Sequence, residues 1–351
     1  MVIGTEFIKT SSNQDRYNAQ WSTSGSDKET FTIANATSLS NGVGLSTSGA
    51  TSVNFNQDQA DHTEVDVNVF SVYVQDEIAL SDYLDLVVGA RFDSFTIEEN
   101  DIGNGGTQEK NNDSNISPRA GLIYKPVENA SLYASYTEAF IPSSGGQYAN
   151  VGDGLDADKF SNLELGGKYE FESGLALTAA VFQNEGTLPY TDANQQIVDA
   201  ESEVQGFELQ LQGRVTNQWF VSAGYGYLDG TVIDVNSGVP EEDTPQELPA
   251  HTFSLWNSYD LNSSFGVGLG VIYQDESVID IDDNDSGADY RMLPSYYRVD
   301  ATAYYNINEN YRVQLNVENL TDETYYPNAH DTHQATVGAP INARLTLFGK
   351  F

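Results

Sequence analysis

The feature that most constrains the fold of this chain is an alternation of apolar and hydrophilic or small residues with a period of two. In residues 265–273 (FGVGLGVIY), every odd-numbered residue is apolar and three even positions are glycine. Successive side chains of a β-strand point to opposite faces, so this spacing predicts a strand with two unlike faces. About fourteen such segments occur, beginning near residues 2, 67, 84, 117, 131, 162, 174, 203, 219, 251, 265, 295, 311 and 343.

The connections between these segments alternate in length. Short turns are expected at residues 80–83, 125–129, 172–174, 216–218, 261–264 and 306–310. Long polar stretches occupy residues 11–64, 96–115, 143–160, 185–202, 230–249, 275–293 and 320–342. Short periplasmic turns and long extracellular loops are typical of an outer-membrane barrel.

A soluble β-sandwich also alternates apolar and polar positions, but nothing in its architecture requires this asymmetry of connections. Tyrosines near the strand ends match the aromatic girdle of a membrane barrel, and they are Tyr124, Tyr133, Tyr169, Tyr227, Tyr273 and Tyr305. The predicted fold is therefore all-β, a transmembrane antiparallel up-and-down β-barrel.

Composition excludes several other classes of protein. No run approaches the ~18 consecutive apolar residues of a membrane-spanning helix, and the start MVIGTEFIKT lacks the pattern of a signal peptide. The 52 acidic and 15 basic residues give a net charge of −37, which repels nucleic acid. Cysteine is absent, so disulfides and thiolate metal sites are excluded.

Four stretches of the sequence resemble the barrel of TonB-dependent outer-membrane receptors. They are residues 117–143, 162–171, 205–230 and 293–330, and the resemblance extends from about residue 65 to the terminus. The ending YYPNAH…GAPINARLTLFGKF is most similar to siderophore receptors, particularly the ferric-catecholate branch. The resemblance implies transport of a ferric siderophore across the outer membrane of a Gram-negative bacterium, with no enzymatic activity and no cofactor.

The resemblance also implies where this chain lies within a receptor. Members of the family have a plug that carries an energy-coupling box, followed by a 22-stranded barrel. Because the chain begins inside a strand and holds about fourteen strands, residues 1–351 are expected to be the C-terminal portion of the barrel. The signal peptide, the plug and the first strands are expected to be absent. Closure of the first strand on the last is a second hypothesis, because an unpaired edge leaves backbone groups unsatisfied in lipid.

The partners implied by the resemblance are a ferric siderophore, the TonB-ExbB-ExbD complex acting through the plug, the barrel assembly machinery, and outer-membrane lipid and lipopolysaccharide. Two alternatives stay open. One is a TonB-dependent receptor for another nutrient, such as cobalamin or a glycan, and the other is a passive porin-like barrel.

Ligand contacts are expected from cationic and aromatic side chains on the hydrophilic face and in the last long loop. The candidates are Arg91, Arg119, Arg298, Tyr326, His330 and His333. The two histidines stand in NAHDTH, which is either a contact for a ferric chelate or a divalent metal, or a polar loop that carries histidines by chance. The loops are short of positive charge, which argues against an anionic catecholate.

Metal and catalytic motifs are weak. Residues 282–290 (DDNDSGADY) begin like a calcium loop, but Leu293 stands where a bidentate Glu is required, so an EF-hand is rejected. Looser cation binding by Asp280, Asp282, Asp283 and Asp285 stays open. No G-x-S-x-G elbow accompanies the four histidines. We therefore predict no catalytic residues and no dedicated metal site.

The last strand is predicted to face lipid on one side. In RLTLFGKF, Leu345 and Leu347 share a face with the terminal Phe351. The resemblance implies that the barrel assembly machinery reads this ending.

Overall fold

The computed structural model describes residues 1–21, 53–102, 106–141, 157–191, 197–234, 241–282, 289–331 and 334–350. Fourteen strands follow one another in chain order in a single antiparallel sheet. They are β1 (Val2–Trp21), β2 (Val53–Ser81), β3 (Leu84–Asp101), β4 (Thr107–Val127), β5 (Ala130–Ile141), β6 (Asp158–Glu170), β7 (Leu175–Thr191), β8 (Ile197–Arg214), β9 (Trp219–Asp234), β11 (His251–Asp260), β12 (Phe265–Gln274), β15 (Tyr296–Asn306), β16 (Tyr311–Glu318) and β19 (Asn342–Gly349). The all-β, antiparallel, up-and-down prediction is confirmed.

Short additional strands lie in the long connections. β10 (Glu241–Asp243) pairs with β9, and two hairpins are formed by β13 (Ser277–Asp282) with β14 (Asp289–Leu293) and by β17 (Asn328–Asp331) with β18 (Gln334–Thr336). Within the described ranges, no helix is long and apolar enough to cross a membrane.

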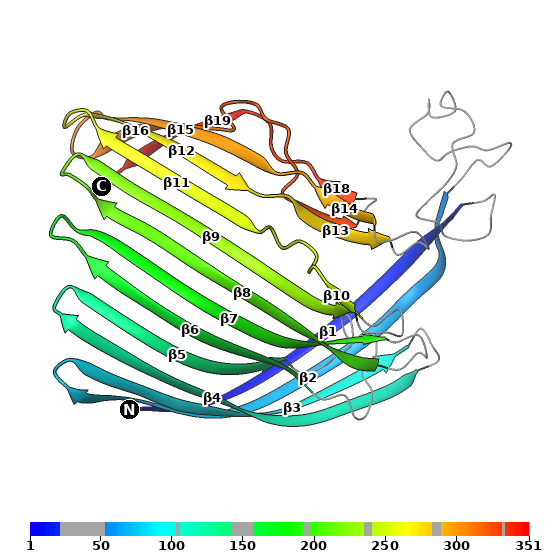
Figure 1. Cartoon of the computed structure of the whole chain (residues 1–351). Helices are drawn as coiled ribbons and strands as arrows, with labels where there is room; N and C mark the ends of the chain where they lie inside the picture. Colours follow the sequence, from blue (N-terminus) through cyan, green and yellow to red (C-terminus); the bar gives the residue numbers. More distant parts are fainter. Residues whose placement is uncertain are drawn as a thin grey trace.

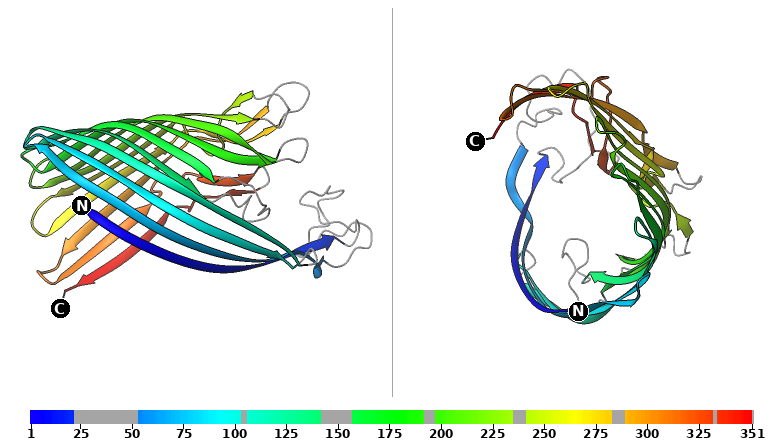
Figure 2. Two further views of the ribbon diagram at one scale, coloured as in Figure 1. Left: turned by 90° about the horizontal axis from the view of Figure 1, so that it is seen from below. Right: turned by 90° about the vertical axis from the view of Figure 1, so that its left-hand side faces the viewer.

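The sheet curls into an incomplete ring (Figures 1 and 2). We call its concave side the inner face and its convex side the outer face. Tight turns join the strands at one end, the short-turn end, where β1 starts and β19 ends; the other end is the long-loop end. β1 and β19 terminate the strand order, and no pairing joins them in the described part of the chain. The hypothesis of closure by the first and last strands is therefore wrong for this structure.

Several strands continue well into stretches that were predicted to be loops. β1 extends to Trp21 and β2 begins at Val53, and the pairing still matches Gln14 with Thr63. β3, β4, β7 and β8 are longer than predicted in the same way. The prediction failed there because it required an apolar face, whereas the ladder of backbone hydrogen bonds continues with polar side chains on both faces.

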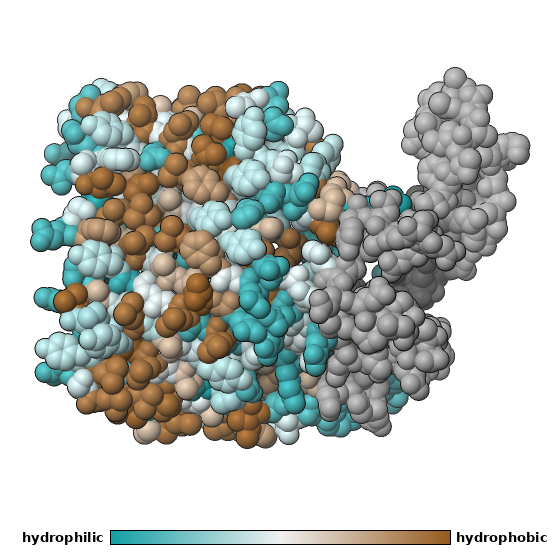
Figure 3. Space-filling view, viewed as in Figure 1, coloured by the Kyte–Doolittle hydropathy of each residue, from teal (hydrophilic) through white to brown (hydrophobic). Residues whose placement is uncertain are grey.

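An apolar belt surrounds the outer face between two hydrophilic rims, seen as a brown band over the front strands in Figure 3. Leu163 and Leu165 of β6 are 56% and 59% exposed, and Leu345 and Leu347 of β19 are 71% and 65% exposed. An exposed apolar surface that continues across many strands is unfavourable in water, so this belt fits contact with a bilayer. Phe351 lies outside the described residues, and the role of this ending in assembly stays a prediction.

One member of the predicted aromatic girdle is on the wrong face. Tyr133 lies on the inner face, where its hydroxyl donates a hydrogen bond to Glu164 and its ring covers Gly166 of the neighbouring strand. Tyrosine fits here because glycine has no side chain to oppose the ring. Similar ring-over-glycine pairs recur on the inner face: Phe182 with Gly206, Trp256 with Gly270, and Tyr304 with Gly266.

Replacing Gly166 with alanine is expected to lower the free energy of unfolding by about 1–3 kcal/mol, because the new methyl group would overlap the ring of Tyr133. Gly121 provides a matched control on the inner face. A methyl group there would meet its nearest neighbour, the Ala134 carbonyl oxygen, at 3.7 Å, which is ordinary contact. Urea unfolding of the full-length receptor in lipid vesicles measures both, and equal effects would contradict this account.

A small apolar core lies on the inner face near the long-loop end. Val65, Phe95 and Ile97 are at most 5% exposed and pack with Ala157, which precedes β6. Asp113 of β4 accepts a hydrogen bond from the Ala157 backbone nitrogen at 3.0 Å. The chain entering β6 is thereby held against the inner face of β2 to β4.

Candidate ligand-binding site

Three connections at the long-loop end pack into one unit, which we call the loop platform: residues 244–250, 275–295 and 319–341, as far as these are described. Glu247 joins all three, because its backbone nitrogen donates to the Val278 carbonyl at 2.8 Å and its Oε1 accepts from the Ala329 nitrogen at 3.0 Å. Glu247 has a φ of 55°, a left-handed conformation that is uncommon outside glycine. Val278, Leu293, Tyr325 and Ala329 are each less than 9% exposed. The platform is thus a preformed structure with its own small core.

Arg298 connects the inner face of β15 to this platform. Its guanidinium binds Asp300 through Nε at 3.0 Å and Nη2 at 2.8 Å, and Nη1 donates to the Tyr325 hydroxyl at 3.3 Å. The Tyr325 ring stacks on Tyr296, with centroids 4.7 Å apart. The Tyr296 hydroxyl donates to Gln274 at 3.3 Å. The result is an aromatic and charged cluster at the mouth of the ring.

Asn319 anchors the return of the chain from β16 into the platform. Its side chain is almost completely buried, and its Nδ2 donates to the carbonyls of Glu323 at 2.8 Å and Ala339 at 3.0 Å. Its Oδ1 accepts from the Glu323 nitrogen, and its own nitrogen donates to Asp300. Asp300 therefore binds both Arg298 and the first residue of the loop.

Arg91 lies on the inner face of β3, far around the ring from β15 (Figure 1). Its Nε binds Asp93 at 2.9 Å, and its Nη2 binds Glu6 of β1 at 2.8 Å and the Ser71 hydroxyl at 2.7 Å. Ser71 is fully buried and Asp93 nearly so. This guanidinium is enclosed by two carboxylates, so its main contacts are structural.

Arg119 lies on β4, where its register partner is Gly89, two residues before Arg91 on β3. It donates to Gln75 at 2.9 Å, and its side chain lies over Gly89. The only polar contact described for this guanidinium is with an uncharged amide.

The structure describes the three loop candidates to different extents. Tyr326 is half-buried beside Tyr325. His330 belongs to β17, but only its backbone is described, and His333 lies outside the described residues. The structure therefore brings Arg298 and Tyr326 to the same platform and keeps Arg91 and Arg119 on a separate part of the wall.

Sequence reasoning missed Asn319, Tyr325, Tyr296 and Glu247. Their roles depend on contacts between residues far apart in the chain, and no local pattern marks them. On the inner face, Arg298 forms an ion pair with Asp300 two residues along the same strand. Arg312 instead lies over the Tyr304 ring, 3.8 Å from its centroid.

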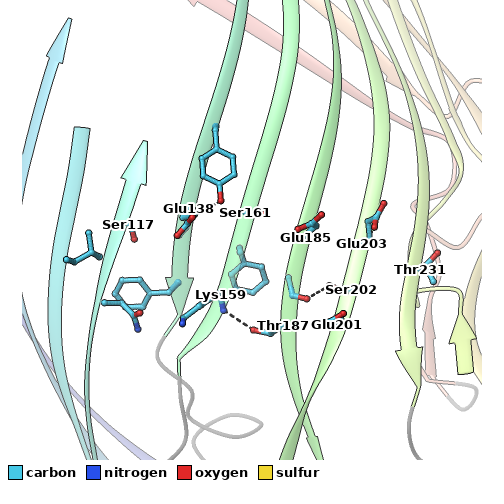
Figure 4. Close-up of a pocket in the computed structure, with 17 residues that line it drawn as sticks. Ser117, Glu138, Lys159, Ser161, Glu185, Thr187, Glu201, Ser202, Glu203 and Thr231 are labelled. Atoms are coloured by element: carbon cyan, nitrogen blue, oxygen red, sulfur yellow. Dashed lines mark hydrogen bonds between the residues drawn. The ribbon is translucent and has the colours of Figure 1, made fainter. Parts of the chain in front are cut away.

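A separate hollow of about 690 Å³ lies at the long-loop ends of β5 to β9 (Figure 4). Its charged lining consists of Glu138, Glu185, Glu201, Glu203 and Lys159. Glu185 and Glu203 are register partners. Both are on the face that carries Leu163 and Leu165, so they belong to the outer rim rather than the inner face. Among the described residues, no group of three or more acidic or histidine side chains is arranged to hold a metal ion.

The family model of the TonB dependent receptor-like β-barrel matches residues 4–320. The probable TonB-dependent siderophore receptor PiuA of Acinetobacter baumannii is 30% identical over 99% of this chain and 50% of its own length. The ferric-pyoverdine 358 receptor of Pseudomonas putida is 29% identical over 78% of this chain and 34% of its own length. The catecholate siderophore receptor Fiu of Escherichia coli K12 is 29% identical over 59% of this chain and 29% of its own length.

Solved structures agree with these matches. The crystal structure of PiuA superposes with a TM-score of 0.81 at 30% identity, covering 99% of this chain and 52% of that one. The closed form of the ferric-catecholate import receptor Fiu gives a TM-score of 0.76 at 20% identity and covers 99% of this chain and 52% of that one. This similarity shows the shared fold. The chain thus spans about half the length of these relatives.

Proposed function

Because this chain belongs to the TonB-dependent receptor-like β-barrel family of the Gram-negative outer membrane, we propose that it forms part of the wall of a receptor that takes up a ferric siderophore. The observation that carries the proposal is the match to a probable siderophore receptor over 99% of the chain. Receptors for pyoverdine and for catecholate siderophores among the relatives support the same cargo class.

We propose that a plug elsewhere in the full-length receptor couples this wall to TonB-ExbB-ExbD, and that the first strands complete the ring. PiuA is about twice as long as the region it shares with this chain, which supports that division. The barrel assembly machinery, lipid and lipopolysaccharide are the other partners of the proposal.

The proposed role is binding and passage without covalent chemistry. Members of this family are receptors and transporters, so we infer that the chain has no catalytic residues. The loop platform and the cluster of Tyr296, Arg298 and Tyr325 form the mouth through which a chelate would enter. We propose Arg298 chiefly as a positioning residue, since Asp300 and Tyr325 hold it.

Iron uptake tests this function directly. Cells in which the full-length gene is deleted are expected to lose growth under iron limitation with the cognate ferric siderophore, and uptake of radioactive iron returns with the gene. The proposal would be contradicted if expression of the gene did not respond to iron and its deletion left the uptake of radioactive iron unchanged. Cobalamin or glycan binding by the purified receptor would favour the other-nutrient alternative. A steady ion conductance in planar bilayers would favour a porin.

Deletion of Phe351 is expected to reduce the amount of full-length receptor in the outer membrane to a small fraction of normal, because the family resemblance assigns this ending to recognition during assembly. Phe348→Ala is the matched control, since Phe348 is a nearby aromatic residue on the inner face of the same strand. Quantitative immunoblots of outer-membrane fractions measure both. Normal insertion after the deletion would refute the assignment.

A further inference from the structure

We propose that the outer rim binds an extended segment of another protein, with lysine or arginine at alternate positions, which adds as a strand beside β4. The site is the hollow at the long-loop ends of β5 to β9 (Figure 4). This surface lies outside the ring, so the proposal is independent of the cargo that the receptor carries. It comes from an open strand edge and from a row of carboxylates next to that edge.

β4 has a partner strand on both sides for only part of its length. It pairs with β3 from Thr107 to Tyr124, whereas its pairing with β5 begins at Arg119. Pro118 stands immediately before the first of these pairs, and proline has no N–H to donate to a ladder. In the described part of the chain, no strand pairs with β4 on that side between Thr107 and Pro118. Such an edge presents backbone donors and acceptors in a row, which is the surface that strand addition uses.

The edge is open because the neighbouring hairpin turns away from it. Phe140, near the end of β5, packs against Phe95 on the inner face of β3, with ring centroids 5.9 Å apart. Ala157, just before β6, belongs to the same core and donates its backbone N–H to Asp113. Ile116 of β4, which lines the hollow, is 64% exposed. The hollow therefore has a free strand edge as one of its sides.

Three glutamates form a row across the strands that line the hollow. The register matches Glu138 with Ser161, Ser161 with Glu185, and Glu185 with Glu203. The row runs from β5 to β8 on the outer side, and its members appear at one level in Figure 4. Like charges directly opposite each other on adjacent strands are destabilising, so Glu185 and Glu203 favour a cation between them.

The row is not neutralised by its immediate neighbours. Its hydrogen-bond donors are uncharged: Tyr136 for Glu138, Gln183 for Glu185, and Gln205 for Glu203. Among the described residues, four carboxylates and one ammonium group line the hollow. This surface attracts basic side chains and repels the phosphate groups of lipopolysaccharide.

The two sides of an added strand would meet different surfaces, because successive side chains point in opposite directions. On the outer side they would meet Ile116 and the glutamate row, which suit the apolar stem and the ammonium group of lysine. On the other side they would meet Ala139 and Phe160, which suit an apolar side chain such as valine. A strand of alternating basic and apolar residues therefore fits the site.

Fluorescence anisotropy of labelled peptides with the purified full-length receptor tests the proposal. We expect KVKVKVK to bind at least about tenfold more tightly than EVEVEVE, and than KKKKVVV, which has the same composition without the alternation. Equal affinities would overturn the proposal. Two isomers of KVKVKVK, each N-methylated at alternate residues, separate a hydrogen-bonded ladder from charge attraction, because N-methylation removes backbone donors. At least one isomer should lose binding, and full binding of both would overturn strand addition.

Substitutions in the row locate the site. Glu185→Gln combined with Glu203→Gln should weaken binding of KVKVKVK about tenfold at low salt, because two ion pairs are lost. The thermal stability of this variant should not fall, since a like-charge pair is removed. Glu128→Gln combined with Glu172→Gln, at the short-turn end, is the matched control. An equal loss of binding in the control would overturn the assignment to the outer rim.

Two other occupants are distinguished by the same assay. Magnesium-dependent binding of purified lipopolysaccharide that requires Glu185 and Glu203, without binding of KVKVKVK, would overturn the proposal in favour of a lipid site. Binding of KVKVKVK that appears only after deletion of residues 143–155 would assign the edge to the receptor's own chain, and would overturn the proposal of a separate protein partner.

Discussion

Replacing Asn319 with alanine is expected to lower the free energy of unfolding of the full-length receptor by about 4 kcal/mol. Three hydrogen bonds of the Asn319 side chain are lost in a place where the residue is 1% exposed. Each buried group left without its partner costs ~1–3 kcal/mol. Asn319 also has a φ of 52°, a left-handed conformation that costs alanine about 1 kcal/mol more.

Asn319→Gly separates the two contributions, because glycine accepts the positive φ but makes none of the side-chain bonds. It should be less destabilising than Asn319→Ala by about 1 kcal/mol. Limited proteolysis between residues 320 and 341 should accelerate in both variants, since Asn319 ties together the two ends of that loop through Glu323 and Ala339. A thermal unfolding curve and a cleavage rate like those of the unaltered receptor would show that the anchor is not needed.

Leu209→Lys on the outer face of β8 is expected to destabilise the receptor in lipid by about 2–4 kcal/mol, the cost of a lysine near the middle of a bilayer. Leu209 is 38% exposed, and its register partners are Ala179 and Tyr225. The side chain therefore points to the apolar belt, where an ammonium group has no water and no carboxylate partner.

Gln210→Lys is the matched control, one residue away on the inner face. The same charge there meets a hydrophilic surface, with Thr178 as a register partner and Glu208 two residues along the strand, so little change is expected. Unfolding by urea in lipid vesicles and the amount of receptor in the outer membrane measure both variants. If both faces were wetted, as in a soluble sandwich, the two substitutions would have similar effects.

Much of the fold can be predicted from the sequence, because a strand with one apolar face alternates apolar and hydrophilic residues with a period of two. The strand starts at residues 84, 219, 251, 265 and 311 were predicted at the positions where the structure has them. The predicted short turns are also present. Leu345 and Leu347 could be assigned to the outer face because a single strand repeats that choice at every second residue.

The long-loop end was less predictable. Polar pairs such as Gln14 with Thr63 continue β1 and β2 beyond any apolar signal, and the hairpins β13–β14 and β17–β18 form in stretches without clear alternation. Tyr133 was assigned to the girdle from its position near a strand end. Its actual face depends on Gly166 and Glu164 of the neighbouring strand, which supply space and an acceptor.

The strand pattern, the apolar belt, the family and the anionic character of the long-loop end can be predicted from the amino-acid sequence, because each is a local or compositional property. The contacts of Arg298 with Tyr325, of Arg91 with Glu6 and of Asn319 with Ala339 depend on the tertiary structure. Arg298 and Arg91 each bind an aspartate two residues along their own strand, whereas their distant partners, Tyr325 and Glu6, lie 27 and 85 residues away. Strand register and loop packing bring those partners together, and no pattern within a single segment encodes them.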